Sequence, residues 1–119
     1  MDHFGVWVII ERDTATVIGD IGFHGPPNET GTVEIGYRVI LDRRGRGYAT
    51  EAAVAIVDWA LSRPNVRAVV AGCDSRGNDP SVRTLERVGF RKTGEVDGQV
   101  SWRDDGDPLP EGDGVSVRP

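Results

Sequence analysis

The N-terminal third of the chain carries runs of β-branched and aromatic residues that predict β-strands. Residues 4–10 form the first run, and residues 17–24 follow after a turn at Asp13 and Thr14, so the two runs predict a hairpin. In residues 32–40, apolar and polar side chains alternate, which is typical of a strand with one buried face. The alternation places Val33, Ile35, Tyr37 and Val39 on one face, and Glu34, Gly36 and Arg38 on the other.

The apolar spacing then changes to the period of a helix. In residues 49–61, apolar side chains recur at i, i+3, i+4, i+7 and i+8, which predicts an amphipathic helix. A short apolar run at residues 68–73 is typical of a buried strand. A second helix is predicted to begin at Asp79, which can cap it, and Pro80, which suits its first position; Gly89 suits its end.

The C-terminal part predicts less regular structure. Residues 90–102 predict another strand, residues 103–113 form a polar loop, and residues 115–117 are either a last short strand or a tail. The order β-β-β-α-β-α-β, with an optional last strand, predicts a mixed α/β sheet. A chain of 119 residues with 38% apolar content suffices for one domain, which we assign to residues 1–102, and residues 103–119 form an acidic loop with the strand or tail.

The net charge of −5 is concentrated at the C-terminus. Residues 103–119 hold five acidic and two basic residues, so the remaining chain carries only −2. A protein this acidic is a poor candidate for general nucleic-acid binding, and we expect no nucleic-acid partner.

Few residue types in the chain suit metal or disulfide chemistry. Cys73 is the only cysteine and cannot form an internal disulfide, which fits a reducing cytoplasm. His3 and His24 are the only histidines and show no metal-ligand spacing, so we expect no metal site. No apolar run approaches ~20 residues and no secretory leader opens the chain, so we expect no membrane partner and a cytoplasmic location.

The segment between the third strand and the first helix is the best candidate for a binding site. Gly45 and Gly47 leave backbone N–H groups accessible, and Arg43, Arg44 and Arg46 surround them. A helix begins immediately afterwards, and a helix N-terminus carries unpaired N–H groups and a partial positive charge. This junction therefore predicts an anion site, and phosphate is its most plausible ligand.

Common nucleotide motifs do not describe this loop. The pattern GxxxxGK[ST] is absent, and GxGxxG is matched only in its first two glycines. Instead, Arg44-x-x-Gly47-x-Ala49 resembles the acetyl-CoA signature of the GNAT N-acetyltransferase superfamily, Arg/Gln-x-x-Gly-x-Gly/Ala. Residues 34–37 (EIGY), 47–52 (GYATEA) and 78–90 (NDPSVRTLERVGF) resemble, in the same order, motifs of the branch that acetylates ribosomal-protein N-termini.

The resemblance implies a GNAT-like fold and an acetyl-CoA site. Backbone amides from Arg44 to Ala49 would hold the CoA pyrophosphate, and Asn78 would contact the pantetheine arm. The strand ending at Cys73 would part from the third strand and admit that arm. Ser81 would either contact CoA or cap its helix. The implied cofactor-binding residues are Tyr37, Val39, Arg44, Gly45, Arg46, Gly47, Tyr48, Ala49, Asn78 and Ser81.

The resemblance also implies transfer of acetyl to an amine, either a protein N-terminus or a small molecule. Such a transfer needs a base for the amine proton and donors for the tetrahedral oxyanion. Glu34 is the candidate base, acting through water, and Gly36 would leave open space beside it. Many relatives place a tyrosine as the acid where this chain has Leu85; Ser81, Tyr48 and solvent are the alternatives, and we take Glu34 and Ser81 as the catalytic candidates.

The chain departs from the family at its N-terminus. The family begins with a further strand and two helices that form a wall of the acceptor site, and here the chain starts at what resembles the second strand. We therefore expect an N-terminally shortened fold in which residues 4–10 leave an apolar edge open to another chain, which predicts a homodimer. The same departure keeps a second function open, an acyl-CoA-binding module without turnover, and a general nucleotide-phosphate binder is a third.

Simpler interpretations of the candidate residues also remain. Glu34 is either the base, an ordinary solvent-facing strand residue or a salt-bridge partner of Arg38, and the loop arginines either bind phosphate or are solvated. Asn78 and Ser81 are either ligand contacts or a turn residue and a first-turn helix residue. His24 is either the end of a strand or part of the acceptor site.

Overall fold

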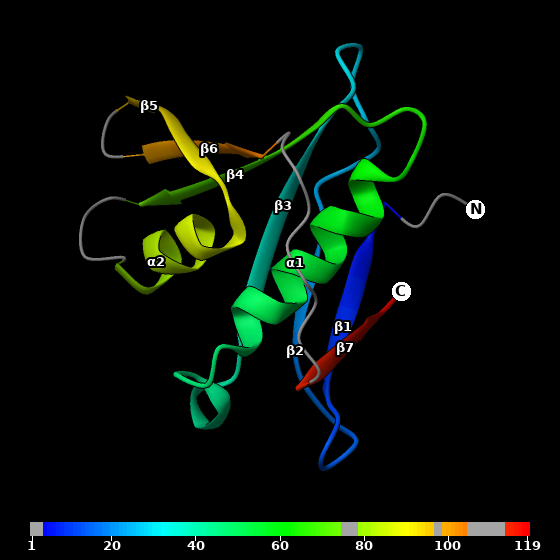
Figure 1. The fold of residues 1–119 in the computed structure, drawn as a ribbon, viewed down its shortest axis with the longest axis vertical. Helices are drawn as coiled ribbons and strands as arrows, with labels where there is room; N and C mark the ends of the chain where they lie inside the picture. Colours follow the sequence, from blue (N-terminus) through cyan, green and yellow to red (C-terminus); the bar gives the residue numbers. More distant parts are fainter. Residues whose placement is uncertain (1–3, 75–78, 97–98, 105–113) are drawn as a thin grey trace.

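The computed structural model describes residues 4–74, 79–96, 99–104 and 114–119, and these residues build one mixed sheet with two α-helices (Figure 1). The strand order is β5-β6-β4-β3-β2-β1-β7. The elements are β1 (Val6–Glu11), β2 (Thr16–Phe23), β3 (Thr32–Val39), the short 3-10 helix η1 (Leu41–Arg43), α1 (Tyr48–Leu61), β4 (Ala68–Asp74), α2 (Asp79–Val88), β5 (Arg91–Val96), β6 (Gln99–Asp104) and β7 (Val115–Arg118).

The sheet confirms the predicted mixed α/β architecture. β1, β2 and β3 pair as an antiparallel meander, and β3 pairs with β4 in parallel across the α1 crossover. The single strand expected in residues 90–102 is instead a hairpin of β5 and β6, and β6 pairs with the far edge of β4. The sequence pattern did not separate the two strands because residues 90–102 contain few apolar residues.

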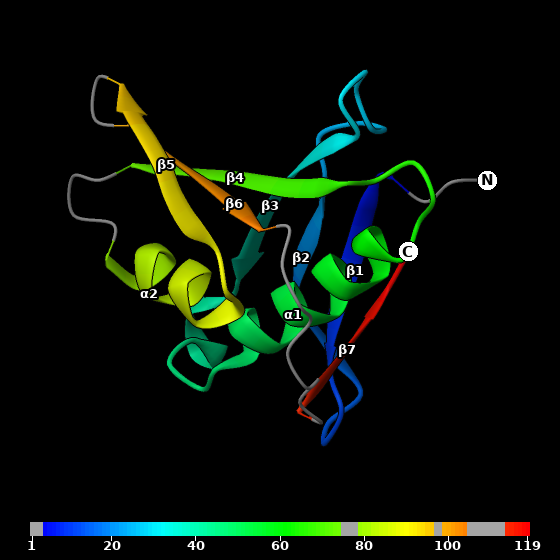
Figure 2. The ribbon, with the colours of Figure 1, turned by 45° about the horizontal axis from the view of Figure 1, so that its top comes forward.

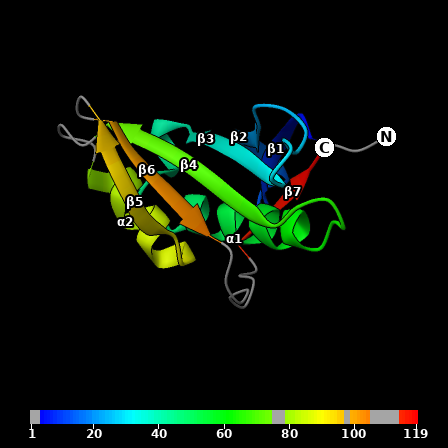
Figure 3. The ribbon, with the colours of Figure 1, turned by 90° about the horizontal axis from the view of Figure 1, so that it is seen from above.

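Both helices pack on the same face of the sheet (Figure 3). α1 buries small residues such as Ala52, Ala53 and Ala60, which bring its backbone close to the strands. At its C-terminal end Trp59 lies among three aromatic rings, with ring centroids 5.1 Å from Trp7, 5.2 Å from Phe4 and 5.6 Å from Phe23. This cluster and the aliphatic side chains of β1 to β4 form one continuous core, which α2 joins through Leu85 and Val88.

The C-terminal strand β7 corrects one expectation. It pairs antiparallel with β1 from Val8↔Arg118 to Glu11↔Val115, so the two run side by side at the edge of the sheet (Figure 2). Val115 is buried against α1, and the N–H groups of Gly114 and Val115 donate to the Glu51 carboxylate at 2.7 and 3.3 Å. The prediction of an open β1 edge is therefore wrong from Val8 to Glu11, and a homodimer through that edge loses its basis.

The strands β3 and β4 part near the middle of the sheet. Their parallel pairs run only from Thr32↔Ala68 to Ile35↔Ala71. β3 continues to Val39 alongside β2, whereas β4 continues to Asp74 alongside β6. The edges of the two strands therefore separate beyond Ile35, as the family resemblance implied, and the gap opens toward the N-terminus of α1.

Candidate functional site

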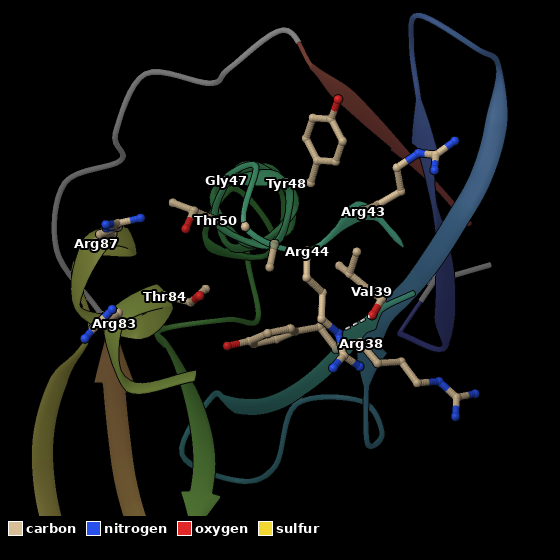
Figure 4. A pocket seen from close by; sticks show the side chains of 13 residues that line it. Arg38, Val39, Arg43, Arg44, Gly47, Tyr48, Thr50, Arg83, Thr84 and Arg87 are labelled. Carbon is tan, nitrogen blue, oxygen red and sulfur yellow. Dashed lines mark hydrogen bonds between the residues drawn. The ribbon is translucent and has the colours of Figure 1, made fainter. Parts of the chain in front are cut away.

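A pocket of about 610 Å³ lies where β3, α1, α2 and the loop of residues 44–47 meet (Figure 4). We call residues 44–47 the glycine loop. Tyr37 and Val39 line it from one face of β3 and Arg38 from the other, so the pocket spans the end of this strand. Its full lining is Tyr37, Arg38, Val39, Arg43, Arg44, Gly45, Gly47, Tyr48, Ala49, Thr50, Arg83, Thr84 and Arg87. None of these residues is acidic, although the chain is acidic overall, so the pocket favours an anionic ligand.

The N-terminus of α1 opens into this pocket. Gly47 is the N-cap residue, in the left-handed region with φ 80° and ψ 6°, and no side chain caps the helix there. Its carbonyl accepts from the Glu51 N–H at 3.0 Å, so the N–H groups of the first turn before Glu51 have no acceptor within the helix. Gly45 is also left-handed, with φ 79°. Both glycines face open space, which lets a ligand approach the backbone.

Two of the loop arginines are held by the protein itself. The Arg44 Nε donates to the Val39 carbonyl at 2.8 Å, which ties the loop to the end of β3 (Figure 4). The Arg43 Nε donates to both carboxylate oxygens of Glu11, at 3.2 and 3.1 Å. Arg46 lies 3.7 Å from the same carboxylate and is not part of the pocket lining. The alternative of a freely solvated loop therefore does not describe Arg43 and Arg44.

Glu11 is the buried charged residue on which these contacts converge. Only 2% of it is exposed, and its carboxylate also accepts from the Thr14 hydroxyl at 2.6 Å and from the Tyr48 hydroxyl. The Thr14 hydrogen bond first, and the Arg43 and Tyr48 contacts with it, lower the pKa of Glu11 below its ordinary value of 4.5 against the effect of burial. The hydrogen bond to Glu11 raises the pKa of Tyr48, so this hydroxyl keeps its proton.

The catalytic candidate Glu34 lies outside the pocket lining, on the sheet face opposite α1. Its partner in β4 is Val70, one pair before β3 and β4 separate. The ring Nδ1 of His24 is 3.4 Å from a carboxylate oxygen of Glu34. The backbone N–H of His24 also donates to the backbone carbonyl of Glu34 at 2.9 Å. About half of the Glu34 side chain is exposed. This carboxylate is therefore accessible from solvent.

One expectation about the surroundings of Glu34 is wrong, and one alternative is excluded. Gly36 does not leave empty space, because a Cβ at this position would lie 3.1 Å from the His24 Nε2. The histidine ring occupies that space, and Gly36 is what admits it. Arg38 does not pair with Glu34; its Nε donates instead to Asp20 at 3.0 Å.

The remaining candidates fall into separate groups. Tyr37, Val39, Gly45, Tyr48 and Ala49, which the family resemblance implies as cofactor-binding residues, line the pocket. Asn78 lies outside the described residues, and Ser81 is described only as part of α2. Leu85, at the position of the missing tyrosine, is 1% exposed and belongs to the core.

Within the described ranges, no group of three or more His, Cys, Asp or Glu side chains could hold a metal, and no helix is long and apolar enough to cross a membrane.

Sequence reasoning missed the contribution of α2 to this site. Arg83, Thr84 and Arg87 form the pocket wall that faces the end of β3 and the glycine loop (Figure 4). Their sequence signal was the i, i+4 spacing of two arginines, which places both on one side of the helix. Such a pair also fits an ordinary solvated face, so it predicts a binding surface only once the pocket is known. Glu11 was missed because an acid next to a turn normally predicts an exposed residue.

Comparison with known proteins agrees with the predicted family. Residues 1–91 match the family described as acetyltransferase (GNAT) domain. The chain is 40% identical over 87 residues to the Bacillus subtilis (strain 168) protein named uncharacterized N-acetyltransferase YjdG, a match that covers 73% of the chain and 51% of that protein. The chain thus spans about half the length of this relative.

Solved structures share the fold. The ribosomal-protein-S5-alanine acetyltransferase from Vibrio fischeri matches with a TM-score of 0.74 at 20% identity, over 87% of this chain and 63% of that one. The microcin C7 self-immunity acetyltransferase MccE, solved in complex with acetyl-CoA and AMP, matches with a TM-score of 0.67 at 22% identity, over 76% of this chain and 56% of that one. At these identities the matches establish the fold alone.

Replacing Glu11 by glutamine tests the buried network. The pKa of Glu11 is lowered in the folded state, so its stabilising contribution is complete above the ordinary value of 4.5 and is lost as the pH falls through the lowered value. We expect E11Q to melt at a lower temperature than the wild type near neutral pH, and the difference to shrink below about pH 4.5. Thermal melts between about pH 3 and pH 7 measure this. E29Q, at an exposed loop position, is the control, and a constant difference across the pH range would contradict the assignment.

Proposed function

Because the chain belongs to the GNAT acetyltransferase family, we propose that it transfers acetyl from acetyl-CoA to an amine, which is either a protein N-terminus or a small molecule. The observation that carries the proposal is the uncapped N-terminus of α1, which opens into a pocket without acidic lining next to the gap between β3 and β4. Many phosphates suit such a helix terminus, but the adjoining gap suits a ligand with a long arm that continues from its phosphates.

The glycine loop holds the CoA pyrophosphate in this proposal. Backbone N–H groups from Arg44 to Ala49 donate to the phosphate oxygens, and the α1 dipole adds partial positive charge. Gly45 and Gly47 support this role through their left-handed φ angles of 79° and 80° and the open space that a Cβ would otherwise fill. Arg44 lines the pocket and holds the loop against Val39.

The arm of the cofactor passes through the gap and presents the thioester to Glu34. This residue lies four positions before Arg38 on β3, roughly 13 Å along the strand, at the point where β3 and β4 part. A neutral amine attacks the thioester carbonyl, its proton passes through water to Glu34, and the C–S bond breaks as the tetrahedral intermediate collapses. His24 orients the carboxylate, and N–H groups of Tyr37 to Val39 stabilise the oxyanion.

The departing thiolate needs a proton, and two of the candidate donors are poorly suited. Tyr48 directs its hydroxyl to Glu11, with a raised pKa, and Leu85 occupies the position of the family tyrosine within the core. Ser81 or solvent supplies this proton in our proposal. A thiolate is stable enough to leave before it is protonated, and because an ordinary thiol has a pKa of about 8.5, it then takes a proton from solvent near neutral pH.

A second candidate function follows from the same residues. The sheet face that carries Glu34 has no helix over it among the described residues, so the acceptor wall of the family is not seen here. A chain that binds acyl-CoA without turnover would show the same pocket. The two functions differ in whether acetyl-CoA is consumed when an amine is added.

Ligand binding is the first test of the proposal. We expect CoA and acetyl-CoA to raise the melting temperature and to give a measurable Kd by isothermal titration, because ligands of the folded state stabilise it. ATP and NAD serve as controls that carry a pyrophosphate but no pantetheine arm. Stabilisation by ATP or NAD without stabilisation by CoA would favour the general nucleotide-phosphate binder.

Replacing Glu34 by glutamine tests the catalytic step. We expect turnover of acetyl-CoA with a panel of amines and N-terminal peptides, followed as free thiol, to fall at least about tenfold, since general-base catalysis contributes roughly a hundredfold or more. The Kd for CoA is expected to stay unchanged, because Glu34 lies outside the pocket lining. E29Q removes a charge from an exposed loop as the control. Thiol release no faster than background from the wild type with every amine would establish the binding module.

Replacing Gly47 by valine tests the loop. We expect the affinity for CoA to fall about tenfold or more, roughly 1.4 kcal/mol, because the side chain fills the approach to the backbone and a β-branched residue disfavours a positive φ. G25V is the matched control, since Gly25 also has a positive φ and open space around it but lies outside the pocket lining. A folded G47V protein that binds CoA as tightly as the wild type would refute the loop assignment.

A further inference from the structure

Two arginines of the pocket stand apart from the others. Five arginines line it, and three of them are engaged by the protein: Arg38 pairs with Asp20, Arg43 with Glu11, and Arg44 donates to the Val39 carbonyl. The other two, Arg83 and Arg87, come from α2 and have no ion pair or hydrogen bond with any residue that the structure describes. Their positive charge is therefore available to a ligand.

The geometry of α2 makes these two arginines a pair. A spacing of four residues places them one helical turn apart on the same side of the helix, with Cβ atoms about 6 Å apart. The side of α2 with Leu85 and Val88 is buried in the core, which fixes the orientation of the helix, and the exposed Arg83 and Arg87 lie along the pocket wall (Figure 4). Glu86, the acidic neighbour between them in sequence, is not part of the pocket lining.

Like-charged neighbours at this spacing repel each other by a few tenths of a kcal/mol. A phosphate monoester between them would remove this repulsion, because it carries close to two negative charges and three oxygens that accept hydrogen bonds. Each guanidinium presents several N–H donors in a planar fork that matches such an anion. The pyrophosphate, in the proposed function, is already held by the loop and the N-terminus of α1, on another wall of the pocket.

We propose that Arg83 and Arg87 form a second phosphate subsite that binds the 3′-phosphate monoester of CoA and selects CoA over its dephosphorylated form. This inference rests on the proposed function, since it requires the pyrophosphate at the glycine loop. It assigns the two arginines to a part of the ligand far from the thioester. They affect the affinity for CoA and leave the chemical step untouched.

Titration with two ligands tests the subsite. The Kd values of CoA and 3′-dephospho-CoA are measured by isothermal titration at one fixed ionic strength, for the wild type, R83Q, R87Q and the double variant. We expect the wild type to bind CoA about tenfold or more tightly than 3′-dephospho-CoA, as charge-assisted hydrogen bonds are strong. In the double variant this ratio is expected to fall close to one, through weaker binding of CoA alone. R12Q, with the same charge change at an exposed position outside the pocket, is expected to keep the wild-type ratio.

The possible outcomes separate the two proposals. Equal binding of both ligands to the wild type would overturn the subsite and leave the proposed function intact. An equal loss of affinity for both ligands in the double variant would also overturn it, because the arginines would then contact the pyrophosphate or support the fold. Failure of the wild type to bind either ligand would remove the proposed function itself, and the subsite with it. Thermal melts of each variant confirm that it is folded.

Discussion

The buried carboxylate of Glu11 joins the end of β1 to the glycine loop and the start of α1, which lie about 30 residues further along the chain. The residue Glu11 ends β1, where its backbone pairs with Val115 of β7. Its carboxylate accepts from Arg43 at the entrance to the glycine loop and from Tyr48 in the first turn of α1. A carboxylate that is 2% exposed is stable as an anion only when several donors surround it. The position of the glycine loop and the start of the helix therefore depend on the same ion, whereas the last strand meets Glu11 only through the backbone pairing with Val115.

A second contact at this end of the sheet joins α1 to β7 through a helix carboxylate and backbone N–H groups at the start of the strand. Glu51, in the first turn of α1, accepts from the N–H groups of Gly114 and Val115, so a helix side chain holds the start of β7. A side chain at Gly114 would come within 2.9 Å of both Glu51 and Tyr48, which explains the glycine there. No side chain caps α1, so its first-turn N–H groups have no acceptor within the helix where it lines the pocket.

The parts of the structure that could be predicted from sequence are those with a local pattern. The alternation at Val33 to Val39, the helical period before Leu61 and the glycines at 45 and 47 each reflect a nearby physical requirement. The pairing of Val8 with Arg118 could not be predicted, because a short apolar run carries no information about which distant strand it joins. The contact of His24 with Gly36 was missed for the same reason: it depends on the register of β2 and β3.

The arginines of the pocket show why a charge count from sequence is a poor guide to a binding site. The loop arginines attracted attention because they flank the glycines, yet Arg43 is neutralised by Glu11 and Arg44 is bound to a backbone carbonyl. A carboxylate beside an arginine offsets the attraction of that arginine for a second anion, whereas a hydrogen bond to a backbone carbonyl leaves the positive charge in place. Among the described residues, the attraction of an anion to this pocket therefore falls to the helix N-terminus, to Arg44 and to the two arginines of α2, whereas the charge of Arg43 is offset by Glu11.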